Sequence, residues 1–296
     1  DAEVLHGTNY VVPPSRIPRL VSVYDCWFLA HPGDASPAVR LAGQVLRRAV
    51  ADGAVVHTSS HATAASVRQH LPGASVHTVH LAALALSPPP AECPFPAVSG
   101  RRFVLALGTL ERRKNLPRLV QAFGLLAADL PDLVLVLAGG DGDDREAIRR
   151  SVDELGGIAD RVVFTGRVDD GARSWLLHHA AALAYPSLDE GFGFPLLDAM
   201  QAGVPVVAST AGSIPEVAGD AALLCPATDV AALAQNLHLA ITSPSVRSSL
   251  VAAGRQQLLR FSWQRCAAEM TDLYRQVAHG TDLRRGAPSS TETEQM

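Results

Sequence analysis

Short apolar runs alternate with stretches of helical period along most of this chain. Before residue 80, the runs predict strands at 4–6, 20–24, 54–58 and 76–79, and helical periodicity lies over 37–51 and 62–70. Strands that alternate with helices are typical of a parallel sheet with right-handed crossovers. We therefore expect an α/β domain in this part of the chain.

A second α/β unit follows a proline-rich linker. Residues 87–100 contain five prolines and show no helical period. Beyond them, apolar runs predict strands at 103–107, 133–138, 162–165, 182–185, 204–208 and 222–224, and helical patterns follow at 229–241, 245–260 and 262–277. The pattern divides the chain into an N-terminal domain with its linker at 1–98, a second domain at 99–262, a last helix at 263–279 and a polar tail, expected to be disordered, at 280–296.

The stretch AYPSLDEGFGFPLLDAMQA at 184–202 places a glycine-rich loop between a strand and a helix. Gly191 and Gly193 allow the loop backbone to approach a ligand, and a helix is expected from Phe194. The free N–H groups at such a helix start suit a phosphate, while the carboxylates of Glu190 and Asp198 can contact hydroxyls. The loop is therefore a candidate nucleotide-sugar site, although an ordinary tight connection between strand and helix has the same local pattern.

Lys114 is the single lysine of a sequence that is rich in arginine. It follows the strand expected at 103–107 and precedes a helix expected from Leu116, with Asn115 as its N-cap and Pro117 in its first turn. An ammonium group at the carboxyl end of a strand can neutralise a pyrophosphate leaving group. A solvated surface lysine is the alternative.

Four successive motifs carry a resemblance to a known family. They are GTLERRKNLPRLVQAF at 108–123, VVFTGRV at 162–168, PSLDEGFGFPLLDAM at 186–200 and GVPVVASTAGSIPEVAGDAALL at 203–224. Together they resemble the donor half of the retaining glycosyltransferases of family 4, in the mannosyltransferase-like branch. The resemblance implies a GT-B fold, in which two Rossmann-like α/β domains face a cleft and the last helix crosses back to the first domain.

The resemblance also implies roles for particular residues. Glu190 and Asp198 match the paired acidic residues of the family's donor-sugar signature, with Glu190 on the sugar hydroxyls and Asp198 on the ribose. Lys114 and Arg113 would hold the pyrophosphate with the loop N–H groups, so no metal or other cofactor is expected. The whole implied donor site comprises Gly108, Thr109, Arg113, Lys114, Arg167, Val168, Glu190, Gly191, Phe192, Gly193, Phe194 and Asp198.

Three positions depart from the family pattern. Asp198 stands where the family usually has Glu, and Thr109 where it commonly has Arg, a guanidinium that Arg113 can replace. Tyr24 and Asp25 stand where the family often has His-Asp near the reacting sugar, and tyrosine is a poor proton acceptor near neutral pH. With His6, these two residues are candidates for the acceptor side.

Composition narrows the remaining choices. The chain has 25 basic and 29 acidic residues, which argues against a nucleic-acid binder. Its four cysteines lack zinc or disulfide-scaffold spacing, so we expect a cytoplasmic protein, with contact at the inner membrane face as an addition. The histidine pairs His57/His61, His77/His80 and His178/His179 show no third ligand at a metal-site spacing, so no metal site is expected.

These features predict an enzyme of polysaccharide biosynthesis that moves a hexose from a nucleotide-diphosphate sugar to a glycan or lipid-linked acceptor. GDP-mannose is weakly favoured as donor. A non-catalytic nucleotide-sugar-binding homologue and a nucleotide-sugar epimerase remain alternatives. The chain begins at Asp1 without an earlier glycine-rich loop, so we expect an incomplete N-terminal domain and poor turnover of a bound donor.

Overall fold

The computed structural model describes residues 2–280 and divides the chain into two units, each with a parallel sheet. Of the described residues, the first unit contains 2–59, 63–79 and 267–280, and the second contains 60–62 and 80–266. Both are α/β, as the alternating pattern predicts. Residues 281–296 of the tail expected at 280–296 lie outside the described residues.

The sheet of the first unit has four strands in the order β1-β2-β3-β4. They are β1 (Leu5–Gly7), β2 (Arg19–Val23), β3 (Val55–Thr58) and β4 (Val76–Thr78), all paired in parallel. Helices α1 (Trp27–Ala30), α2 (Pro37–Ala51) and α3 (His61–His70) connect them. Apolar side chains of β2, β3, α2 and α3, such as Val21, Val56, Leu46 and Val67, form one core.

The sheet of the second unit has six parallel strands in the order β10-β9-β8-β5-β6-β7. The strands are β5 (Phe103–Leu107), β6 (Val134–Ala138), β7 (Val162–Gly166), β8 (Ala182–Tyr185), β9 (Val206–Ser209) and β10 (Ala222–Cys225). The chain starts in the middle of the sheet at β5, builds outward through β6 and β7, and then returns to the other side of β5. Ligands of open α/β sheets bind at the carboxyl ends of the strands where the order reverses in this way, which here is between β5 and β8.

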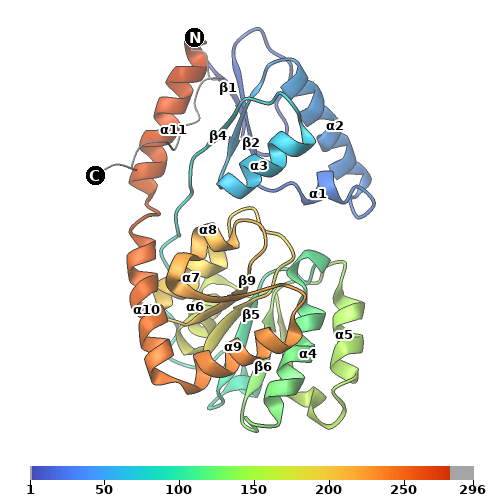
Figure 1. Ribbon diagram of the computed structural model, residues 1–296, viewed down its shortest axis with the longest axis vertical. Helices are drawn as coiled ribbons and strands as arrows, with labels where there is room; N and C mark the ends of the chain where they lie inside the picture. The colour runs from blue at the N-terminus through green and yellow to red at the C-terminus, as the bar shows by residue number, and fades with distance from the viewer. Residues whose placement is uncertain (1, 281–296) are drawn as a thin grey trace, which may run out of the picture. The chain divides into compact units, whose positions relative to one another are not determined.

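Helices cover both faces of this second sheet (Figure 1). On one face lie α4 (Leu116–Ala127), α5 (Arg145–Asp153) and α9 (Val230–Thr242), and on the other lie α6 (Asp170–His179), α7 (Phe194–Ala202), α8 (Ile214–Ala218) and α10 (Pro244–Leu258). Successive side chains of a strand point to opposite faces. Val104 therefore joins the core under α4, α5 and α9, and Leu105 joins the core under α6, α7 and α8. A sheet buried on both faces explains the continuous apolar runs of the sequence.

Two local details differ from expectation. Residues 80–98, expected to close the N-terminal domain, pack in the second unit instead, because apolar side chains such as Ala82 and Val98 join its core. Asn115 stands at the N-cap position of α4, but its side chain caps nothing. Its amide donates instead to the carbonyls of Pro186 and Ala227, at 2.9 and 2.8 Å, and so ties the loops after β8 and β10 together.

The last helix, α11 (Trp263–Ala278), begins after Ser262, whose hydroxyl accepts from the backbone N–H of Arg265 at 3.2 Å. Ser262 therefore caps the start of this helix. Within this helix, residues 263–266 belong to the second unit and residues 267–278 to the first. Within the described part of the chain, we find no helix with the length and apolar character that a bilayer span requires.

Candidate functional site

The candidate site lies at the carboxyl ends of β5 and β8. The loop after β5 begins with Gly108, whose φ of +139° belongs to the region that favours glycine, and a Cβ there would lie 3.1 Å from Cε of Lys114. A short 3₁₀ turn, Arg112–Lys114, then directs the lysine back over this glycine. Close approach of the next loop adds to the crowding, since a Cβ on Gly139 would lie 1.9 Å from the carbonyl oxygen of Gly108.

Glu190, in the loop after β8, lies between two cations. Its Oε1 is 2.6 Å from Nζ of Lys114, and its Oε2 is 2.6 Å from a guanidinium nitrogen of Arg113. The lysine also donates to the hydroxyl of Tyr185, at 3.2 Å. The Glu190 side chain is 6% exposed, while those of Lys114 and Arg113 are 12% and 18% exposed, so the cations have the greater access to solvent.

The two cations determine the ionisation of this cluster. Burial opposes the charged form of Glu190, but the ammonium of Lys114 and the guanidinium of Arg113 outweigh it and lower the pKa of the carboxyl. Burial and the nearby Glu190 charge raise the pKa of Tyr185 well above its ordinary value. At neutral pH the cluster is therefore a carboxylate with two cations and a neutral phenol.

A loop after β9 holds the Glu190 segment in place. Gly212 has φ of +54° and packs so closely that a Cβ on it would lie 2.6 Å from the backbone nitrogen of Glu190. The next residue, Ser213, donates its backbone N–H to the carbonyl of Glu190 at 3.0 Å. In addition, Ser209 donates its hydroxyl to the carbonyl of Ser187 at 2.6 Å. The acidic loop is thus fixed by backbone contacts and has little freedom to move its carboxylate.

A surface cavity of about 550 Å³ opens beside this cluster. It lies where the loops after β5, β6, β7 and β8 meet, and it is open to solvent. Its lining includes the predicted donor-site residues Gly108, Thr109, Lys114, Arg167, Val168, Phe194 and Asp198. Gly191, Phe192, Gly193, Glu190 and Arg113 do not line it; Phe192 and Glu190 are buried beside it, and Gly193 is the residue before α7, with φ of +97°.

Asp198 is engaged by a cation that the sequence did not single out. Its Oδ2 lies 2.5 Å from a guanidinium nitrogen of Arg173, on helix α6. Burial raises the pKa of Asp198 to about 6, and the arginine opposes this rise. A positive side chain in the first turns of a helix is unfavourable toward the helix dipole, and this was the available signal that Arg173 has a partner. The contact of the Tyr185 hydroxyl with Lys114 was not predicted either, because an aromatic residue at the end of an apolar strand has the sequence pattern of a core residue.

The acceptor-side candidates lie in the first unit, where His6 and Asp25 are hydrogen-bonded and Tyr24 packs against a neighbouring ring. His6 Nδ1 is 2.7 Å from the hydroxyl of Tyr274, and its Nε2 is 2.9 Å from Ser22 Oγ. Asp25 accepts from the hydroxyl of Tyr10 at 3.0 Å. Tyr24 meets Tyr10 edge to face, with ring centroids 6.3 Å apart. Burial lowers the pKa of His6, which favours its neutral form near pH 7.

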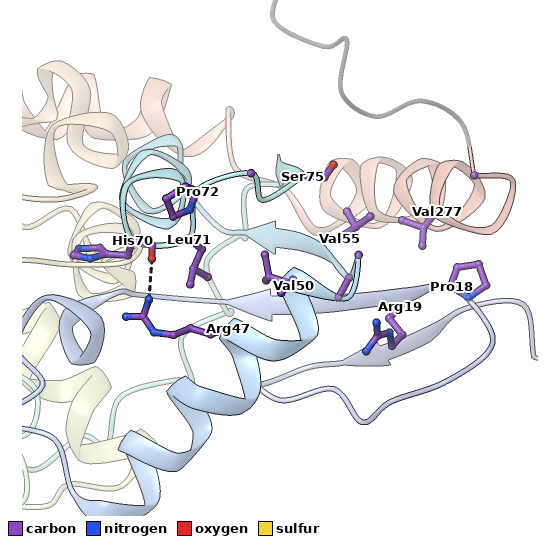
Figure 2. A pocket seen from close by; sticks show the side chains of 15 residues that line it. Pro18, Arg19, Arg47, Val50, Val55, His70, Leu71, Pro72, Ser75 and Val277 are labelled. Carbon is purple, nitrogen blue, oxygen red and sulfur yellow. Dashed lines mark hydrogen bonds between the residues drawn. The ribbon is translucent and has the colours of Figure 1, made fainter.

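The first unit also has a surface cavity of about 750 Å³, which Figure 2 shows from close by. It lies at the amino ends of β2, β3 and β4, the end of a parallel sheet opposite to the one where ligands usually bind. Its two arginines are already used, because Arg19 donates to the carbonyl of Asp52 and Arg47 donates to that of His70. We therefore do not count it as the candidate site.

Histidines that are distant in the sequence meet in one place. His61 and His80, from two different sequence pairs, lie together with Glu216, and one ligand atom from each lies within 4.8 Å of the others. Sequence spacing could not reveal this group, since its three members come from three separate segments. It belongs to the second unit, and none of its members lines the 550 Å³ cavity.

Comparison with known proteins agrees with this geometry. The family model described as glycosyl transferases group 1 matches residues 94–257. The chain is 31% identical over 288 residues to the O-antigen chain mannosyltransferase B of Escherichia coli, a match that covers 92% of this chain and 74% of the relative. It is also 33% identical over 179 residues to a phosphatidyl-myo-inositol mannosyltransferase of Mycobacterium leprae, where the match covers 59% of this chain and 46% of the relative.

Among solved structures, the chain resembles sucrose-phosphate synthase from Thermosynechococcus elongatus, with a TM-score of 0.74 and 25% identity. This match covers 90% of the present chain and 69% of the other. The structure of WaaG, a glycosyltransferase involved in lipopolysaccharide biosynthesis, agrees in fold with a TM-score of 0.68 at 18% identity, over 97% of this chain and 79% of that one. The predicted GT-B architecture is confirmed by these likenesses.

Proposed function

The chain belongs to the glycosyl transferases group 1 family, and within it we propose a retaining hexosyltransferase that uses a nucleotide-diphosphate sugar. The observation that carries the proposal is the pair of cations, Lys114 and Arg113, held on the carboxylate of Glu190 at the point where the strand order reverses. Two partly exposed cations beside an open cavity suit a diphosphate leaving group.

In the proposed reaction the chain mainly positions the donor and neutralises the leaving group. Lys114 and Arg113 stabilise the negative charge that develops on the diphosphate as the bond to the anomeric carbon breaks. The N–H groups at the start of α7 add to this field. Glu190 accepts hydrogen bonds from sugar hydroxyls, and Asp198, oriented by Arg173, accepts them from the ribose. The donor chemistry needs no metal, because fixed cations supply the charge.

Mannose is the sugar that the relatives favour. Both curated relatives described above are named as mannosyltransferases. We extend this to GDP-mannose as the donor and to a glycan or lipid-linked molecule as the acceptor, with the reaction at the cytoplasmic side of a membrane. His6, Tyr24 and Asp25 are the acceptor-side residues of this proposal.

A binding and turnover experiment tests the proposal. The thermal midpoint of the protein is measured with GDP-mannose, UDP-glucose, GDP and guanosine, each in EDTA, because a ligand that binds the folded state raises it. We expect the largest rise with GDP-mannose and release of GDP when a mannose-containing acceptor is added. Binding without release, across varied acceptors, favours a non-catalytic homologue. Conversion of the sugar nucleotide without an acceptor favours an epimerase, and absence of any nucleotide-dependent shift contradicts all three.

A further inference from the structure

His61, His80 and Glu216 form a cluster outside the 550 Å³ cavity of the candidate site. His61 is the first residue of α3, His80 follows β4, and Glu216 lies in α8, so three segments that are far apart in sequence contribute one residue each. One ligand atom from each lies within 4.8 Å of the other two. All three belong to the second unit.

We propose that this cluster binds a divalent transition-metal ion of the zinc class. Two imidazoles and one carboxylate are a common protein ligand set for zinc, with water in the open position. The same set also suits other first-row metals, whereas magnesium prefers oxygen ligands. The ion would bind His80 Nε2 and the Glu216 carboxylate in place of their direct 2.6 Å contact, and it would add His61 as a third ligand.

The distances allow the site to form by side-chain rotation. In a tetrahedral zinc site with bonds of about 2.1 Å, ligand atoms lie roughly 3.4 Å apart. His80 Nε2 and Glu216 Oε1 lie 2.6 Å apart and would separate slightly. The widest pair, at no more than 4.8 Å, would close by about 1.4 Å. His61 is exposed and can supply most of this movement.

Two of the three ligands are already oriented. The carboxylate of Glu216 accepts from the backbone N–H groups of His61 and Ala62, at 2.9 and 3.1 Å. These bonds fix its direction; Oε2 keeps a further lone pair for a metal, and Oε1 does so once the ion displaces the His80 contact. The ring of His80 packs edge to face on Phe261, with centroids 5.6 Å apart. Gln257 holds the backbone of α8 by donating to the carbonyl of Val217 at 2.9 Å.

The cluster is also accessible to an ion. Side chains of His80 and Glu216 are 19% and 21% exposed, so an ion and a coordinating water can enter. An ordinary His80–Glu216 hydrogen bond is the competing interpretation, and in it the His61 ring only packs edge to face on the His80 ring, with centroids 5.3 Å apart.

His61→Ala separates the two interpretations. It removes one imidazole but keeps the backbone N–H that Glu216 uses and leaves the His80–Glu216 contact in place, so the variant should fold normally. His238→Ala is the matched control, because His238 is a partly exposed histidine on α9 whose described ring contact is with Thr242 of the same helix. The full chain is dialysed against a chelator, and binding of Zn²⁺ and of Mg²⁺ is measured by calorimetry.

We expect the unaltered chain and His238→Ala to bind one equivalent of Zn²⁺ with equal affinity and to show no Mg²⁺ binding at the same concentrations. His61→Ala should bind Zn²⁺ at least about tenfold more weakly. Substitution with Co²⁺ should give the visible absorption of a low-coordinate site in the first two proteins. A loss of less than tenfold in His61→Ala, an equal loss in His238→Ala, or no stoichiometric Zn²⁺ binding overturns the proposal.

Discussion

Replacing Lys114 by alanine tests the central charge of the proposed donor site. In the structure the ammonium is 2.6 Å from Glu190 Oε1 and 3.2 Å from the hydroxyl of Tyr185, and its side chain is 12% exposed. A hydrogen bond to a charged group contributes about 1.5–3 kcal/mol. Because the lysine must share its interactions between Glu190 and the diphosphate, we expect the low end of this range.

The expected result is a loss of about tenfold in affinity for GDP and GDP-mannose, which corresponds to about 1.4 kcal/mol. Affinity for guanosine, which has no phosphate, should stay within about twofold, a difference of about 0.4 kcal/mol. The measurement is isothermal titration calorimetry in EDTA, so that no divalent ion contributes. Thermal unfolding of the variant checks that Glu190, left with Arg113 alone, has not destabilised the domain.

Arg112→Ala is the matched control. Arg112 lies in the same 3₁₀ turn, is exposed and carries the same charge. If this variant loses as much diphosphate affinity as Lys114→Ala, the effect is a general one of net charge and the argument for a specific contact is wrong. Unchanged GDP affinity in Lys114→Ala would mean that the lysine serves only to neutralise Glu190. Equal losses for guanosine would indicate a distorted cavity.

Three further predictions concern the neighbouring loops. Glu190→Gln should weaken GDP-mannose binding several-fold while leaving GDP unaffected, as measured by calorimetry; equal losses for both would contradict a role in reading the sugar. Gly212→Ala should lower the free energy of unfolding, measured in urea, by more than about 1 kcal/mol, because its φ is +54° and its Cβ would lie 2.6 Å from the backbone of Glu190. Gly157→Ala, where the new Cβ has no neighbour within 4 Å, should change this free energy little. The stability that protonated Asp198 contributes is present below about pH 4 and is lost as pH rises through its folded pKa of about 6. As pH rises between these values, the free energy of unfolding of Asp198→Asn should therefore increase by up to about 3 kcal/mol relative to that of the unaltered chain. Parallel pH profiles of the two proteins in urea denaturation would refute the raised pKa.

The strands of the second sheet could be predicted from the sequence because this sheet is buried on both faces. Continuous apolar runs such as FVLAL at 103–107 allow little choice of state, and the observed strands begin and end within two residues of the expected ones. Strand β9 begins at Val206 rather than at 204, because Pro205 cannot donate to a neighbouring strand. Helix α5 was not anticipated, since it presents a mostly polar sequence, REAIRRSVD, with few buried residues.

The gathering of the candidate-site residues could be predicted for a different reason. Their motifs are local, and each lies directly after a strand or at the start of a helix, so the topology of a parallel sheet brings them together. Contacts between loops were not readable. The place of Arg173 near a helix start suggests a partner but does not identify Asp198, and no short pattern indicates that Asn115 joins two loops. Such partners depend on loop conformations. For the same reason the meeting of His61, His80 and Glu216 had to come from the structure.

A sequence with one lysine contains one side-chain amine, and here that amine is buried against a carboxylate. Reductive methylation with ¹³C-formaldehyde would therefore attach a single side-chain label at Lys114, and its NMR signal has to be distinguished only from that of the α-amino group. Because its side chain is 12% exposed, the reaction should be slow in the free protein and slower still when a diphosphate covers the amine. The chain thus carries a built-in spectroscopic reporter at the position where the donor is expected to bind, and no cysteine or unnatural residue has to be introduced to use it.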